Sequence, residues 1–216
     1  MSTAIEKILQ NLHRVIDWSD PLVWLAAAHI TFNPFFWNVS ARLEYKTKLY
    51  TRIFGSAKVG CYVLATITFL IGLTRNFVVV VAVTRQLSLE SYLGLETIAY
   101  MKVIGTLCII TGLTLAISSM FKLGITGTYL GDYFGMLKDS RVTAFPYNVV
   151  DNPMYVGSTV AFLGLAVRMM SPIGFLLTVY IWLVYNIALF FEEPFTAKIY
   201  SAKDEISTST KEIKAQ

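Results

Sequence analysis

The chain has 216 residues, of which 55% are hydrophobic and 15% are charged, and its mean hydropathy is +0.58. Soluble domains carry about 25% charged residues, so this composition indicates an integral membrane protein, and the length suits one domain. The formal net charge of +4 comes from segments that flank apolar runs, which fits anionic lipid headgroups and not nucleic acid. The two cysteines and two histidines lack metal-ligand spacing, so we expect neither a disulfide framework nor a metal site.

The first segments combine amphipathic and interrupted apolar patterns. AIEKILQNLHRVID, residues 4–17, has apolar side chains at helical spacing, which predicts an amphipathic helix on the membrane surface or packed on the rest of the protein. PLVWLAAAHITFNPFFWNV, residues 21–39, is apolar enough to enter a membrane, but Asn33-Pro34 interrupts it. Because proline removes a helix hydrogen bond, we expect a re-entrant or half-spanning segment here.

Four further apolar runs predict an all-α membrane protein with about four transmembrane helices. Each run approaches the length of about 20 residues that a spanning helix needs, and no tract alternates as a transmembrane barrel would. The expected spans are residues 59–74, 103–121, 155–170 and 172–191.

We divide this single domain, residues 1–216, by the expected role of each part. Residues 1–58 hold the amphipathic and re-entrant segments, 59–121 the first two spans, 122–200 the catalytic and cofactor-binding part, and 201–216 a polar tail. Lysine and arginine concentrate on one side of this arrangement, so the positive-inside rule predicts that both termini are cytosolic. That prediction requires the segment 21–39 to enter and leave on the same side.

Two adjacent carboxylates, Glu192 and Glu193, end the last apolar run and precede Pro194. Pro194 is expected to end the helix, which would place both carboxylates at the negative end of the helix dipole. One interpretation is an interfacial pair that stops the helix in water. The other is a site for a positive ligand, because ionisable groups at membrane depth are often functional.

The segment FKLGITGTYLGDYFG, residues 121–135, carries glycines at helical spacing and a carboxylate between aromatic residues. Its glycines are Gly124, Gly127, Gly131 and Gly135. On a helix they would form one bare stripe, suited either to close helix packing or to the approach of a ligand. Tyr129, Asp132 and Tyr133 suit a cation, through charge attraction and cation–π contact.

A third segment, RVTAFPYNVVDNPMYVGS, residues 141–158, leads into the next apolar run. Arg141 fits a ligand carboxylate or a lipid phosphate, or serves as a positive-inside anchor. Asn152, Pro153 and Tyr155 lie at the start of the following apolar helix.

Three long stretches of the sequence closely resemble the small phosphatidylethanolamine N-methyltransferases. They are LGITGTYLGDYFGMLKDSRVTAFPYNVVDNPMYVGST (123–159), FEEPFTAKIY (191–200) and ITFNPFFWNVSARLEYKTK (30–48). The resemblance implies an enzyme that transfers methyl groups from S-adenosyl-L-methionine to the amine of phosphatidylethanolamine, or of its mono- and dimethyl derivatives, giving phosphatidylcholine. It also implies phospholipid as the partner from the bilayer and the endoplasmic reticulum membrane as the location, with a mitochondrial membrane as the alternative.

The family's cofactor motifs are a GxG in the third apolar segment and a paired glutamate at the end of the last helix. The first falls on Ile110-Thr111-Gly112, where only the second glycine is kept, and the second falls on Glu192-Glu193. The wider superfamily has an Arg-His-Pro-x-Tyr pattern, which is replaced here by residues 151–155, DNPMY. The missing histidine argues against a prenylcysteine substrate.

The resemblance assigns roles to the candidate residues. Glu192 and Glu193 jointly, with Asp132 as the alternative base, would take the amine proton and offset the sulfonium charge. Tyr133 and Arg141 would contact the lipid. The remaining expected cofactor contacts are Ile110, Thr111, Gly112, Gly127, Tyr129, Gly131, Arg141, Asn152, Pro153 and Tyr155, with the glutamate pair.

Two other classes of function fit parts of the sequence. A membrane scaffold or lipid-binding protein without catalysis would explain the glycines and aromatic residues, but not the glutamate pair. A membrane reductase would also bind an adenine cofactor, and nicotinamide dependence would distinguish it. The sequence does not predict an oligomeric state.

Overall fold

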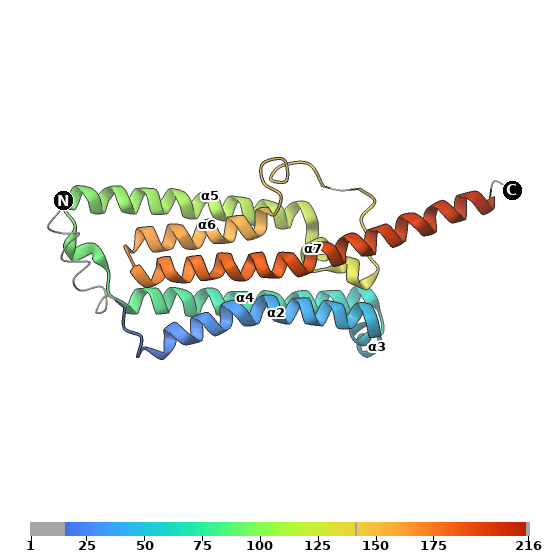
Figure 1. Ribbon diagram of the computed structural model, residues 1–216, viewed down its shortest axis with the longest axis horizontal. Coiled ribbons are helices and arrows are strands. Elements are labelled where there is room, and N and C mark those ends of the chain that lie inside the picture. Colours follow the sequence, from blue (N-terminus) through green and yellow to red (C-terminus); the bar gives the residue numbers. More distant parts are fainter. Residues whose placement is uncertain (1–15, 141, 215–216) are drawn as a thin grey trace.

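The computed structural model describes residues 16–140 and 142–214, and the side chains of these residues up to Lys203. It is a bundle of long helices, and the described residues contain no strand (Figure 1). Most of the amphipathic helix expected at residues 4–17, and Arg141, lie outside the described residues. The elements are α2 (Pro21–Thr47), α3 (Leu49–Phe54), α4 (Ala57–Arg85), η2 (Leu89–Tyr92), α5 (Leu95–Thr128), η3 (Gly131–Phe134), α6 (Pro153–Arg168) and α7 (Pro172–Lys214).

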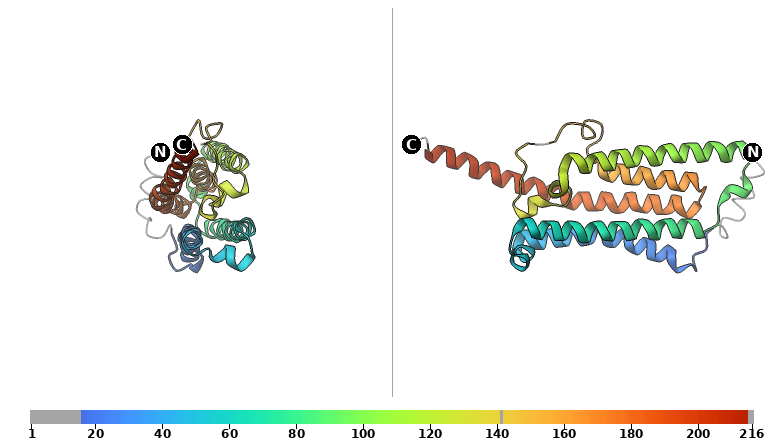
Figure 2. Two further views of the ribbon diagram at one scale, coloured as in Figure 1. Left: turned by 90° about the vertical axis from the view of Figure 1, so that its right-hand side faces the viewer. Right: turned by 180° about the vertical axis from the view of Figure 1, so that it is seen from behind.

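The long helices α2, α4, α5, α6 and α7 lie side by side, and successive helices run in opposite directions (Figures 1 and 2). α5 packs along α6, α2 packs along α4, and α7 contacts both α6 and α2. The last part of α7 extends beyond the bundle. In the described part of the chain, three segments are long and apolar enough to cross a membrane: Ala57–Tyr92, Leu95–Phe134 and Pro172–Lys203. The expected all-α membrane fold is therefore confirmed.

Apolar side chains occupy both the interior and the outer surface of the bundle. Val79, Ile181 and Tyr185 are buried in the core between α2, α4, α6 and α7. By contrast, Phe77 of α4 and Phe190 of α7 are 69% and 73% exposed. A large exposed apolar surface is typical of helices that face lipid, which agrees with the composition.

Glycines bring α5 and α6 into close contact. Gly105 and Gly112 of α5 face Gly164 and Gly157 of α6. A methyl group added at Gly112 would lie 2.5 Å from the Ala161 backbone nitrogen, so the two backbones leave no room for a side chain. Small residues at such an interface allow the close packing that holds membrane helices together.

The glycines of the segment 121–135 do not form the expected stripe on one helix, so that prediction is wrong. Gly124 has a φ of +67° and makes a kink inside α5, which ends at Thr128. Gly131 begins the short helix η3, and Gly135 ends it with a φ of +85°. Because glycine adopts positive φ without steric cost, Gly124 and Gly135 turn the chain and do not line a helix face.

The segment 21–39 is not re-entrant, because α2 continues through Pro34 over 27 residues. Val23, Ala26 and Ile30 of α2 are buried in the core, and this tertiary packing outweighs the hydrogen bond lost at the proline.

The two ends of α2 lie at opposite ends of the bundle (Figure 1). Before α2, the Asp17 amide donates to Gln86 Oε1 at 2.8 Å, just after the end of α4. Asp20 likewise pairs with Arg85 at 3.5 Å. The positive-inside prediction requires the segment 21–39 to enter and leave on one side. In this structure the segment does not turn back, because it is part of one continuous helix.

Candidate active site

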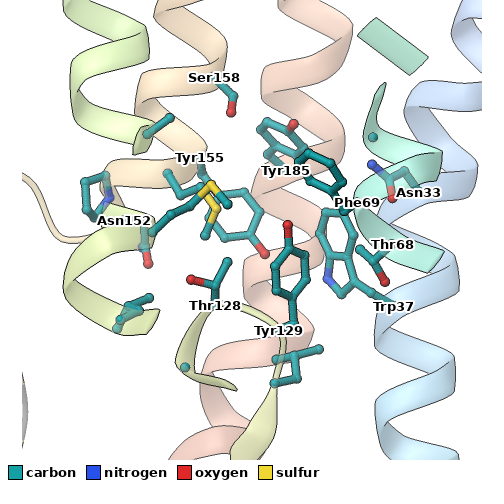
Figure 3. A pocket seen from close by; sticks show the side chains of 18 of the residues that line it. Asn33, Trp37, Thr68, Phe69, Thr128, Tyr129, Asn152, Tyr155, Ser158 and Tyr185 are labelled. Carbon is teal, nitrogen blue, oxygen red and sulfur yellow. The ribbon is translucent and has the colours of Figure 1, made fainter. Parts of the chain in front are cut away.

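A cavity of about 340 Å³ opens between α2, α4, α5, α6 and α7 (Figure 3). It lies toward the end of the bundle where α7 extends outward. Six residues predicted from the sequence line it: Gly127, Tyr129, Asn152, Pro153, Tyr155 and Glu192. They come from α5, the turn after α5, the start of α6 and α7, so the fold gathers segments that are far apart in the sequence.

The start of α6 holds both glutamates of α7. The Tyr155 hydroxyl donates to Glu192 Oε2 at 2.8 Å, and the Asn152 side-chain amide donates to Glu193 Oε1 at 2.9 Å. Asn152 and Tyr155 are three residues apart around the first turn of α6, so they present their polar groups on one side. The pattern Asn-Pro-x-Tyr therefore supplies the two hydrogen bonds that hold the glutamate pair.

The two carboxylates differ in their surroundings. Glu192 lines the cavity, whereas Glu193 is exposed and does not line it. The prediction that Pro194 ends the helix is wrong, because α7 continues through it to Lys214. The pair therefore does not lie at a helix C-terminus, and the helix dipole does not act on it as expected. The Arg42 guanidinium packs against Phe195 and donates to the Phe191 carbonyl at 2.6 Å, beside the proline.

Aromatic side chains surround the central part of the cavity. Tyr129, Trp37, Tyr155 and Tyr185 approach it from different elements (Figure 3). The ring centroids of Tyr155 and Tyr185 are 5.0 Å apart, and those of Trp37 and Tyr155 are 6.3 Å apart. Aromatic faces next to a carboxylate suit a ligand with a positive charge.

Three buried polar atoms that face the cavity have no hydrogen-bond partner among the described residues. They are Asn33 Oδ1, Thr68 Oγ1 and Thr128 Oγ1. Buried polar groups are nearly always hydrogen-bonded, so these atoms are suited to a polar ligand or to water.

The segment between η3 and α6 contributes one further wall through Tyr147. Its hydroxyl lies 2.6 Å from the Ser119 hydroxyl of α5, and the residue lines the cavity. Burial raises the pKa of Tyr147, although the hydrogen bond to Ser119 acts in the opposite direction. Tyr147 is thus a neutral hydrogen-bonding group that fixes this segment over the cavity.

Sequence reasoning missed several cavity residues, of which Arg75 is the most polar. The expected span 59–74 stops just before Arg75, but Arg75 lies inside α4 and is only 7% exposed. The signal that could have found it is the apolar run FVVVVAV, residues 77–83, which continues the helix beyond Arg75. Asn33, Trp37 and Thr68 lie within α2 and α4 and carry no local signal.

Other predicted residues lie outside the cavity lining. Ile110 is exposed, as is Thr111, while Gly112 is buried against α6. Gly131, Asp132 and Tyr133 belong to η3, where Tyr133 is buried and stacks on Phe195 with ring centroids 5.1 Å apart. Gly112 packs against α6, and Tyr133 packs against Phe195. The roles of all these residues toward a cofactor or substrate stay predictions.

The fold and the cavity define an α-helical membrane protein with an aromatic, carboxylate-lined cavity among its helices. Residues 100–203 match a family model described as phospholipid methyltransferase. The chain is 42% identical over 205 residues to the phosphatidyl-N-methylethanolamine N-methyltransferase of Saccharomyces cerevisiae, covering 95% of this chain and 98% of the relative. It is 46% identical over 209 residues to the Neurospora crassa protein of the same name, covering 94% and 96%.

A vertebrate relative matches to a similar degree. The chain is 47% identical over 188 residues to the phosphatidylethanolamine N-methyltransferase of Homo sapiens, covering 87% of this chain and 92% of that protein. No solved structure matches the chain. This protein belongs to the phospholipid methyltransferase family, which confirms the resemblance and the expectation of an enzyme.

Proposed function

We propose that this protein transfers methyl groups from S-adenosyl-L-methionine to the amine of phosphatidylethanolamine or of its mono- and dimethyl derivatives, giving phosphatidylcholine. The relatives are named for these substrates. The observation that carries the proposal is the Glu192 carboxylate, which lines an aromatic cavity among membrane helices. A scaffold without catalysis does not need such a group, and the family does not favour that alternative.

The cavity fits the proposed cofactor by its chemistry. A carboxylate and aromatic faces suit a sulfonium cation, and the unpartnered oxygens of Thr128 and Asn33 suit polar atoms of the ligand. Gly127, Tyr129, Asn152, Pro153, Tyr155 and Glu192 are the residues that would hold it. When bound, the cofactor supplies an electrophilic methyl group on sulfur.

The protein's own residues prepare the lipid amine. The amine must lose a proton before it is nucleophilic, and Glu192 is the base placed in the cavity to accept it. The Tyr155 hydroxyl orients the Glu192 carboxylate through its hydrogen bond. Glu193, bound to Asn152, fixes α7 against the start of α6. The buried cavity also holds the two reactants together, which contributes a large part of the rate.

We place the enzyme in the endoplasmic reticulum membrane, with the glutamate pair near the cytosolic face. The apolar helices support a membrane location. Lys138, Lys198 and Lys203 lie near the end of the bundle where the pair is found, and Lys203 bonds to Lys138 and Asp139 there. Positive residues favour the cytosolic side, where the soluble cofactor is available.

An assay with the purified protein and labelled S-adenosyl-L-methionine tests the proposal. Phosphatidylethanolamine, its monomethyl form and its dimethyl form are offered separately in mixed micelles. We expect label in the lipid, and the pattern across the three acceptors identifies the steps catalysed. Folded protein that labels none of the three lipids would contradict the proposal.

A further inference from the structure

Arg75 is a buried cation within an apolar helix. It is 7% exposed and lies in the middle of α4, with Phe162 and Tyr185 rings at 5.5 Å and 5.8 Å from its guanidinium carbon. Arginine stays charged in proteins, and a charge at membrane depth is costly unless it is compensated. Such a residue is a candidate for a functional role.

The partners of Arg75 in the structure are neutral. Its Nε and Nη2 donate to Asn76 Oδ1 at 3.2 Å and 2.9 Å, and its Nη1 donates to the Tyr185 hydroxyl. No ion pair with Arg75 forms among the described residues. A guanidinium has five N–H donors, of which these contacts use three. The remaining donors and the positive charge suit an anionic oxygen group.

The cavity connects Arg75 to Glu192. Both residues line it, as do Asn76 and Tyr185. Tyr185 and Glu192 are two helical turns apart on α7, which is about 10 Å along the axis. The cavity therefore has a negative group near the end where α7 leaves the bundle and a positive group deeper among the helices.

The deeper part of the cavity has apolar walls where α4 faces α5. These two helices pack together much less than α5 and α6 do. The wall residues on this side are Phe69, Gly72, Leu73, Ala116, Met120 and Leu123. Acyl chains fit such walls, whereas a soluble cofactor gains little from them.

We propose that Arg75, held by Asn76 and Tyr185, binds the phosphodiester group of the lipid substrate inside the cavity. This inference rests on the proposed function. In an ethanolamine phospholipid, two carbons join the amine to the phosphate. A headgroup that lies along the cavity thus places its amine toward Glu192, its phosphate toward Arg75 and its acyl chains beside the α4–α5 wall. Arginine matches a phosphate through charge and paired N–H donors.

Steady-state kinetics of Arg75→Gln test the inference. We expect the KM for phospholipid to rise by about tenfold or more, as for loss of a charged hydrogen bond, and the KM for S-adenosyl-L-methionine to change less than about twofold. Arg75→Lys retains the charge and should recover part of the loss. The matched control is Arg85→Gln on the same helix, whose side chain is 63% exposed and which should change neither KM.

The methyl donor also carries an anionic group, its carboxylate. The same kinetic experiment shows whether Arg75 binds that carboxylate or the lipid phosphate. A rise in the KM for S-adenosyl-L-methionine with an unchanged KM for lipid would overturn the assignment to phosphate. If Arg75→Gln does not fold, Tyr185→Phe removes one partner of Arg75 and keeps the ring. That variant should raise the lipid KM by about threefold, and no change in it would contradict the proposal.

A binding measurement separates this inference from the proposed reaction. Short-chain phosphatidylcholine and a long-chain alkyltrimethylammonium, which lacks phosphate, are titrated into the purified protein by calorimetry. Arg75→Gln should weaken binding of the phospholipid by about tenfold and leave the phosphate-free cation within about twofold. This result would support the phosphate site even in a protein that methylates no lipid, whereas equal weakening of both probes would overturn it.

Discussion

Glu192 and Glu193 are neighbours in the sequence, but the helix directs their carboxylates to different surroundings. Successive residues of an α-helix point about 100° apart, so only one of an adjacent pair can face a given cavity. Glu192 takes that position, with Tyr155 as its donor, and Glu193 bonds to Asn152 at the exposed edge. The sequence predicts one joint role for the two carboxylates, whereas their different surroundings in the structure favour separate roles.

Replacing each glutamate by glutamine should therefore have unequal effects. Glu192→Gln removes the proposed base and should lower kcat/KM for methyl transfer by about 10²-fold or more. Glu193→Gln keeps a hydrogen-bonding group beside Asn152 and should cost about tenfold or less. Methyl transfer by purified variants of matched stability measures both. Equal losses, or a larger loss at Glu193, would contradict this division.

The Tyr155 hydroxyl donates to Glu192, and its ring also forms a cavity wall. Tyr155→Phe keeps the ring and should lower kcat/KM by about tenfold, because the carboxylate loses its orienting hydrogen bond. Tyr180→Phe on α7 is the matched control, since its hydroxyl contacts Thr31 away from the cavity. The kcat/KM of Tyr180→Phe should stay within about twofold of that of the unchanged enzyme. A similar loss in both variants would mean that general packing, and not Glu192, explains the effect.

At the scale of elements, the interface between α5 and α6 depends on glycine. This contact positions Asn152 and Tyr155, because α6 carries both residues at its start. A side chain at Gly112 or Gly157 would meet the opposite backbone, and overpacking of this kind costs about 1–3 kcal/mol.

Gly112→Ala accordingly should lower the thermal stability of the purified protein. Thr111→Ala, next to it on the exposed side of α5, should change the melting temperature little. We expect the KM for S-adenosyl-L-methionine to stay within about twofold in the folded Gly112 variant, because the residue lies outside the cavity lining. An unchanged melting temperature with a raised KM would instead support a cofactor contact at residues 110–112.

The long apolar runs made α4, α5 and α7 predictable, because membrane helices require such runs. The two prolines were harder to interpret. Pro34 and Pro194 both predicted breaks from local hydrogen bonding, but α2 and α7 continue through them. Packing along neighbouring helices compensates for one lost hydrogen bond, and that packing has no signature within the segment itself.

Part of the candidate site was also predictable from the sequence. Tyr129, Asn152, Tyr155 and Glu192 stand in distinctive polar segments, and the fold brings them to one cavity. Arg75 stands within an apolar helix, where its sequence neighbours give no indication of what it faces. Only the arrangement of α4 against α7 shows that its guanidinium and the Tyr185 hydroxyl meet.

At the scale of the whole molecule, the direction of α2 determines the topology. Since α2 runs the length of the bundle (Figure 1), Asp20 caps its start at one end, and Arg42 near its other end bonds to Phe191, beside the glutamate pair. A helix of 27 residues is about 40 Å long, which exceeds the hydrocarbon thickness of a bilayer. From this length we predict that Asp20 and the C-terminal part of α7 lie on opposite faces of the membrane, and the cytosolic location of both termini stays a prediction.

Single cysteines in a background without the two native ones distinguish these topologies. Ser19 and Ser91 lie near the connection between α4 and α5, because Asp17 bonds to Gln86 and η2 contains Ser91. Ser140 and Ser201 lie near the lysines that follow the glutamate pair, because Asp139 bonds to Lys203. All four serines are exposed, and each is replaced by cysteine in turn. In sealed microsomes, an impermeant thiol reagent should label the second pair directly and the first pair only after permeabilisation. The segments at the end of the bundle that holds Glu192 and Glu193 are rich in lysine, so the positive-inside rule predicts that this end lies in the cytosol. Direct labelling of Ser19→Cys together with Ser201→Cys would instead mean that α2 does not cross the membrane and that both ends share the cytosolic face.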